Sequence, residues 1–94
     1  MGLEEEFELQ LSKNVTEMKK HGRFTRLQNF LNEHGYLKGA KILIQKDGTS
    51  GLTELFDKGQ QQLSIENLAL QEKYQPLFSP EDIKNCKRKL GIKQ

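Results

Sequence analysis

The spacing of apolar residues over the first twenty positions is the strongest constraint on how this chain folds. Five of them follow one another at intervals of four, four, four and three residues: Leu3, Phe7, Leu11, Val15 and Met18. These intervals place the side chains on one stripe of an α-helix, whereas a strand would bury every second residue. Glutamates crowd the beginning of the segment and lysines its end, which is the distribution that the helix dipole favours. The sequence therefore predicts an amphipathic helix over residues 1–20, which Gly22 ends.

Further short helices are expected beyond this segment, because apolar residues at helical spacing alternate with glycines that end a helix. The segment 24–31 leads to a stop at Gly35, and the segment 37–44 follows it. Within the latter, the continuous apolar run 42–44 leaves a short strand as the alternative to a helix. Residues 46–51 carry no apolar side chain, which predicts a surface loop.

The middle of the chain predicts two more helices. The first is closed by Gly59 and has Ser50 or Thr53 as a possible cap. Its expected inner face consists of Leu52, Leu55 and Phe56. The second begins after Ser64, and Pro76 limits it to about residue 73 or 74, because the residue before a proline avoids the α conformation.

The clearest helix start in the sequence is Ser79 followed by Pro80 and two acidic residues. A capping hydroxyl, a proline at the first helical position and acids in the first turn all favour a helix at this point. We expect this last helix to run from Pro80 to Leu90. Its predicted inner face consists of Ile83, Cys86 and Leu90.

The composition fits one small folded domain. Leu, Ile, Val and Phe make up 25 of the 94 residues, a share above the roughly 20% associated with intrinsic disorder. No apolar run reaches the roughly 18 residues of a membrane helix, and the acidic start is unlike a secretory signal. We expect an all-α fold, a compact bundle of about six short helices in the cytoplasm, with no membrane partner. The domain would span 1–94, with an N-terminal helix over 1–20 and a helical core over 23–91.

No group of residues has the spacing of a catalytic or metal site. Zinc needs three or four convergent ligands, and no pair among His21, His34 and Cys86 lies at such a spacing. Both histidines precede a glycine that is expected to end a helix, where imidazolium interacts with the last carbonyls. Cys86 is the single cysteine and falls on an apolar stripe, which favours a small buried side chain over a nucleophile. The sequence thus predicts no catalytic residue, no metal and no cofactor.

Glu66 stands apart from the other acids, because it follows the capping residue Ser64 by two positions. Most glutamates crowd the start of the first helix, where solvation and the helix dipole account for them. Glu66 could instead point back to the start of its own helix, or form an ion pair with Lys41 or Arg88. Both alternatives are structural roles.

The charge is unevenly distributed along the chain. Residues 19–46 carry seven Lys or Arg and one Glu, and residues 83–94 carry five basic residues and no acid. The two basic blocks, 19–41 and 84–93, could join in space and bind phosphate groups. The residues expected to contact nucleic acid are Arg26, Lys84, Lys87 and Arg88. The competing expectation is that the basic blocks neutralise acidic segments within the fold.

A protein partner is the other possibility that the sequence raises. A long amphipathic helix ahead of a compact domain can pack on that domain or on another chain, and both arrangements require the same apolar pattern. Phe7, Leu11 and Tyr74 are the residues expected to contact a partner if the helix packs outward. The chain would then be a monomer or a homodimer.

The order of several features between about residues 24 and 90 resembles a family of small bacterial all-helical domains of uncharacterised function. The features are Gly35 with Ala40-Lys41-Ile42-Leu43, Ser50-Gly51-Leu52 with Leu55, Gly59 with Leu63-Ser64-Ile65-Glu66, and Leu77-Phe78-Ser79 with Glu81. The family pattern has Arg and Asp where this chain has Gln60 and Gln62. The resemblance implies a helical module of the bacterial cytosol. We therefore expect a non-catalytic interaction or regulatory module, with a nucleic-acid-binding accessory protein as the alternative and an enzyme as a distant third.

Overall fold

The computed structural model describes residues 2–46 and 51–91. Two 3-10 helices occur there, η1 (Gln61–Leu63) between α4 and α5 and η2 (Glu72–Leu77) between α5 and α6. The α-helices are α1 (Leu3–His21), α2 (Thr25–His34), α3 (Tyr36–Gln45), α4 (Leu52–Asp57), α5 (Ile65–Ala69) and α6 (Pro80–Lys89). Neither described range contains a strand, which confirms the all-α prediction.

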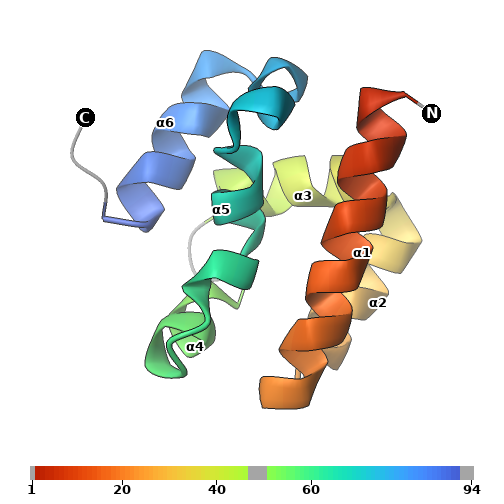
Figure 1. The fold of residues 1–94 in the computed structure, drawn as a ribbon, viewed down its shortest axis with the longest axis vertical. Coiled ribbons are helices and arrows are strands. Elements are labelled where there is room, and N and C mark those ends of the chain that lie inside the picture. Colours follow the sequence, from red (N-terminus) through yellow and green to blue (C-terminus); the bar gives the residue numbers. More distant parts are fainter. Residues whose placement is uncertain (1, 47–50, 92–94) are drawn as a thin grey trace.

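The helix α3 is central to the arrangement. It packs against α1 and α2 and also against α5 and α6. In Figure 1, α1 and α6 lie on opposite sides of the molecule, with α5 between them. The buried residues Ala40, Leu43 and Ile44 stand three and four positions apart on α3. This spacing gives a helix one inner face, which explains why residues 37–44 do not form the strand that the apolar run 42–44 left open.

Two glycines allow α3 to approach α2 closely. Gly35 joins the two helices with a φ of 90°, a value that L side chains rarely adopt. On α3, a Cβ atom added to Gly39 would lie 2.9 Å from the Cδ2 atom of Leu31 on α2. The backbone of α3 therefore runs close over the side chains of α2, and this contact fixes the walls of the pocket described below.

The predicted apolar stripe of α1 packs inward. Its buried residues are Phe7, Leu11, Val15 and Met18. Phe7 meets the rings of Tyr74 and Phe78 edge-on, each at 5.3 Å between centroids. The hypothesis that Phe7, Leu11 and Tyr74 contact a partner is therefore corrected, because these side chains are buried within their own chain.

The caps predicted at Ser64 and Ser79 form. The Ser64 Oγ atom accepts a hydrogen bond from the backbone N–H of Asn67 at 3.0 Å. At the start of α6, the Ser79 Oγ atom accepts from the N–H of Asp82, and the Asp82 carboxylate accepts from the N–H of Ser79. This reciprocal pair satisfies two backbone donors at once and fixes where α6 begins.

The structure differs from the predicted helix after Ser64. That helix ends at Ala69, and the 3-10 helix η2, which contains Pro76, occupies the positions that follow. Gln71 between them is extended, with φ −62° and ψ 133°. The side-chain amide of Gln75 donates to the carbonyl oxygen of Leu70 at 2.9 Å. Because this bond satisfies a carbonyl at the end of α5, the chain can turn five residues before the proline.

The predicted inner face of α4 is partly wrong. Leu52 and Leu55 are buried, whereas Phe56 is 41% exposed. The N-cap of α4 is Gly51 in the left-handed conformation, without a side-chain hydrogen bond. The alternative cap Ser50 lies outside the described residues, as does most of the loop predicted over 46–51. The short helix α5 buries Ile65, Leu68 and Ala69 at the same spacing, so the length of α4 does not explain the exposure of Phe56.

Candidate functional site

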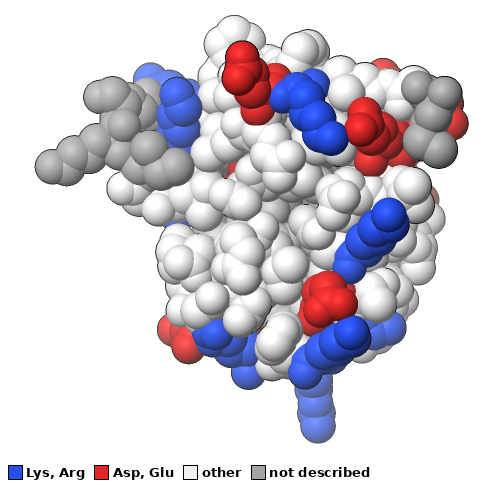
Figure 2. All heavy atoms as spheres, viewed as in Figure 1, with Lys and Arg blue, Asp and Glu red and all other residues white. Residues whose placement is uncertain are grey.

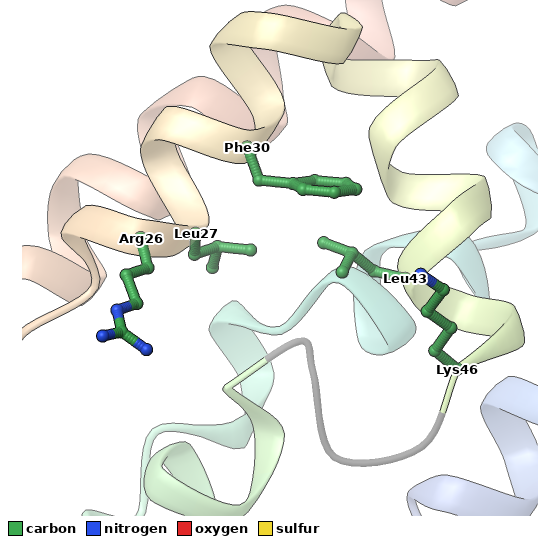
Figure 3. A pocket seen from close by; sticks show the side chains of 5 residues that line it. All are labelled: Arg26, Leu27, Phe30, Leu43 and Lys46. Atoms are coloured by element: carbon green, nitrogen blue, oxygen red, sulfur yellow. The ribbon is translucent and has the colours of Figure 1, made fainter.

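A pocket opens between α2 and α3, and we call it the α2–α3 pocket. Its volume is about 220 Å³. Among the described residues, five line it: Arg26, Leu27, Phe30, Leu43 and Lys46. Figure 3 shows Leu27 and Leu43 reaching toward each other from the two helices, with the ring of Phe30 beside them.

The walls of the pocket are apolar. Leu27 and Leu43 are buried, and Phe30 is half-buried. Phe30 also contacts the ring of His34 one turn along α2, at 4.3 Å between centroids. The His34 ring supports the Phe30 ring from one side. Together with Leu27 and Leu43, the Phe30 ring forms the apolar wall of the pocket.

The two polar residues of the pocket are both cations. Arg26 and Lys46 are exposed, and Figure 3 shows them at opposite sides of the pocket. None of the described residues that line the pocket is acidic. Within residues 2–46 and 51–91, no hydrogen bond or ion pair occupies the Arg26 guanidinium or the Lys46 ammonium. The pocket therefore combines apolar walls with two cationic groups that are available to an anion.

A buried lysine holds two of the lining residues, Leu43 at the end of α3 and Lys46 directly after it. The Lys89 ammonium on α6 donates to the carbonyl oxygen of Leu43 at 2.8 Å and to that of Lys46. It also lies 3.4 Å from the Glu66 carboxylate on α5, with exposed side-chain fractions of 7% for Lys89 and 0% for Glu66. One ammonium thus ties the ends of α3 and α6 to the buried carboxylate of α5.

The structure places beside Glu66 a cation that the expectation from the sequence did not name. That expectation named Lys41 or Arg88, and the structure supplies Lys89. Arg88 and Lys89 are adjacent, but neighbouring residues of a helix point about 100° apart. Lys89 faces inward and Arg88 is exposed, so the pairing depends on how α6 is rotated against α5.

The residues expected to contact nucleic acid come from two helices, α2 and α6. Arg26 belongs to α2 and lines the α2–α3 pocket. Lys84, Lys87 and Arg88 belong to α6; Lys84 and Arg88 are exposed and Lys87 is half-buried. We call these three the α6 basic face. In the view of Figure 2, Lys and Arg side chains lie at separate places around an uncharged centre, several of them beside Asp or Glu.

The thiol and the imidazoles do not form a reactive centre. No group of three His, Cys, Asp or Glu residues that could hold a metal ion occurs among the described residues. His21 and His34 are exposed at the ends of α1 and α2. Cys86 is buried, as its apolar position predicted, and burial together with the nearby Glu66 carboxylate raises the pKa of its thiol to about 12. A thiol of this kind is a weak nucleophile at neutral pH.

We expect the Cys86 thiol to react with a disulfide reagent such as Ellman's reagent far more slowly in the native chain than in the urea-unfolded chain. Near pH 8 the difference should be on the order of a thousandfold, because the native thiol is almost entirely protonated and the unfolded thiol is not. Rates measured by absorbance in and out of urea check this expectation. Equal rates would contradict the burial of the thiol.

The raised pKa of the Cys86 thiol also predicts how the stability of the fold depends on pH. The native thiol keeps its proton to about pH 12, whereas the ordinary value is 9.0, so the unfolded state loses a proton first. The stabilising contribution is therefore complete below about pH 9 and is lost as the pH rises toward 12. Urea unfolding of the wild type and of Cys86→Ala at several pH values should show the wild type losing stability relative to the variant in this window.

Sequence reasoning identified Arg26 but missed the rest of the pocket. Leu27 was recognised only as an apolar helix residue, and Lys46 only as part of a loop. Arg26 and Phe30 are four residues apart and share a helix face, which is a signal that the sequence does contain. No local pattern, however, shows that Leu43 and Lys46 come to the same place, since this depends on the approach of α3 to α2.

Comparisons of the chain with protein-family models, with curated proteins and with solved structures gave no match. None of the described helices is long and apolar enough to cross a membrane.

Proposed function

We propose that this chain is a non-catalytic interaction or regulatory module of a bacterial cytosol, and that it binds a protein partner through the α2–α3 pocket. One observation carries the proposal: the pocket is apolar and open, and its two cations have no partner within the described part of the chain. Partner interfaces typically concentrate their binding energy in such pockets, with charged residues around them. The bacterial and cytosolic parts of the proposal rest on the resemblance to small bacterial helical domains.

The chemistry of Cys86 supports the non-catalytic part of the proposal. The sequence contains no other cysteine, and this thiol is buried with a pKa raised to about 12. Nucleophilic catalysis requires an exposed group with a base within hydrogen-bonding distance. The buried ion pair of Glu66 and Lys89 has a structural role at the end of α3, which accounts for the acid that the sequence had set apart.

The experiment is a comparison of three forms of the tagged chain in affinity capture from a bacterial lysate. The pocket variant carries Arg26→Glu and Lys46→Glu, and the control variant carries Lys84→Glu and Lys87→Glu. Both change the net charge by the same amount. A protein retained by the wild type and the control but lost from the pocket variant would support the proposal. A protein retained equally by all three forms would contradict the pocket as the interface.

The α6 basic face favours a second candidate function, an accessory protein that binds nucleic acid. Lys84 and Arg88 are exposed and four residues apart on one helix face. If this candidate is right, the chain should bind duplex or single-stranded DNA with an affinity that falls steeply with added salt, because phosphate contacts release counterions. The variant with Lys84→Glu and Lys87→Glu should then lose that affinity. The absence of binding at about 50 mM salt would exclude this candidate.

A further inference from the structure

We infer that the α2–α3 pocket accepts one large apolar side chain from a partner segment whose neighbouring residues are acidic. This inference rests on the proposed function and adds the chemistry of the partner. It follows from the size of the pocket, the nature of its walls and the two cations beside it.

The volume of the pocket suits a single side chain better than a whole small-molecule ligand. Sites for small molecules and cofactors usually enclose about 300 to 1,000 Å³. The α2–α3 pocket has about 220 Å³, which is less than this range but enough for one phenylalanine, leucine or methionine side chain. An anchor residue of a longer segment that lies across α2 and α3 fits this volume.

The walls select an apolar anchor. Leu27 and Leu43 offer only carbon atoms, and Phe30 adds a ring that pairs well with a second aromatic side chain. Apart from the two cations, no described side chain in the lining can donate or accept a hydrogen bond. A nucleobase stacked on Phe30 would leave its polar edges against aliphatic carbon, where the loss of hydrogen bonds to water is costly. The walls therefore favour a peptide side chain over a base.

The cations select the residues that flank the anchor. Arg26 and Lys46 lie on opposite sides of the pocket, so a segment that crosses it passes one cation before the anchor and the other after it. Three other lysines, in contrast, have partners within the chain: Lys19 with Gln28, Lys20 with Glu17, and Lys73 with Glu6. Carboxylates on both sides of the anchor would complement the two free cations, speed association and lose strength with salt.

The test uses the full chain and a seven-residue peptide with phenylalanine at its centre and three glutamates on each side, blocked at both ends. The backbone amide resonances of the ¹⁵N-labelled chain are followed during titration, which also detects weak binding. We expect shifts at the amides of α2 and the end of α3. Replacing the central phenylalanine by alanine should weaken binding about tenfold or more, which corresponds to about 1.4 kcal/mol. A peptide with lysines in place of the glutamates should not bind.

Variants of the chain supply the matched controls. The pocket variant, Arg26→Glu with Lys46→Glu, should weaken binding of the acidic peptide at least about tenfold. The variant Lys84→Glu with Lys87→Glu carries the same charge change on α6 and should bind within about twofold of the wild type. Arg26, Lys46 and Lys84 are exposed, and the amide spectrum of each variant shows directly whether the fold is retained.

Several outcomes would overturn the inference. Equal binding of the phenylalanine and alanine peptides would show that the apolar pocket is not used. Equal losses of peptide affinity in both chain variants would show that binding depends on net charge and not on the pocket. Shifts of the pocket amides with an oligothymidine instead of the peptide would assign the pocket to nucleic acid. A mass in solution that rises with concentration, and that the pocket variant abolishes, would assign it to a second copy of the chain.

The failure of this inference can be distinguished from the failure of the proposed function. If the acidic peptide does not bind, but a captured protein is still lost from the pocket variant, the pocket is an interface for a partner of different chemistry. The inference is then wrong and the proposed function stands. If the captured proteins do not depend on the pocket and the peptide does not bind, both are wrong.

Discussion

Replacing Lys89 by methionine should lower the free energy of unfolding by about 3 to 5 kcal/mol, because it removes one partner of the buried ion pair with Glu66. Methionine keeps most of the length of the lysine side chain, so the loss of the charge and of its hydrogen bonds dominates the effect. The carbonyl oxygens of Leu43 and Lys46 would lose a donor at the same time. Urea unfolding followed by circular dichroism measures this change.

The control for this prediction is Lys84→Met, because Lys84 is an exposed lysine of the same helix. Its effect should stay within about 0.5 kcal/mol, as for most surface substitutions. The variant Glu66→Gln should cost less than Lys89→Met, since it removes the buried negative charge while the ammonium keeps its two carbonyl partners. If Lys89→Met and Lys84→Met were equally stable, the contacts of Lys89 with the end of α3 and with Glu66 would not contribute to the stability of the fold.

The variant Phe7→Ala should also lower the free energy of unfolding by about 3 to 5 kcal/mol. Phe7 is fully buried and holds α1 against the rings of Tyr74 and Phe78. Its removal would leave a cavity and two edge-on aromatic contacts unmade. Because Tyr74 belongs to η2, the cavity would lie between α1 and η2 and weaken the packing of these two elements.

The matched control for Phe7→Ala is Leu9→Ala on the same helix. Leu9 is 48% exposed, so its truncation should change the stability by no more than about 0.5 kcal/mol. Urea midpoints of the two variants are to be compared with that of the wild type. Similar losses in both variants would contradict the inward packing of the α1 stripe.

The helices were largely predictable because each has its own local signal. The intervals from Leu3 to Met18 predicted α1, and the combination of Ser79 and Pro80 predicted the start of α6. What failed was decided by individual side-chain contacts that helical periodicity does not reveal. The turn after Ala69 requires the side-chain amide of Gln75 to reach back to a carbonyl, and no propensity scale contains that bond.

The candidate site was less predictable than the fold. Arg26 was identified because it belongs to a basic segment, yet its neighbours in the pocket come from another helix. The burial of Lys89 was missed for a related reason: within a run of basic residues, the sequence does not show which one faces inward. A polar residue becomes internal only when a carboxylate such as that of Glu66 lies opposite, and this depends on the packing of α5 against α6.

The position of Lys89 on the last described helix has a consequence for folding during synthesis. The ribosome makes α3 and α5 before it makes the ammonium that both require. Until that lysine emerges, docking α5 would remove water from the carboxylate of Glu66 without the ion pair to Lys89. The first three helices can assemble early, whereas closure of the other half is delayed until the final turn of α6 has been translated.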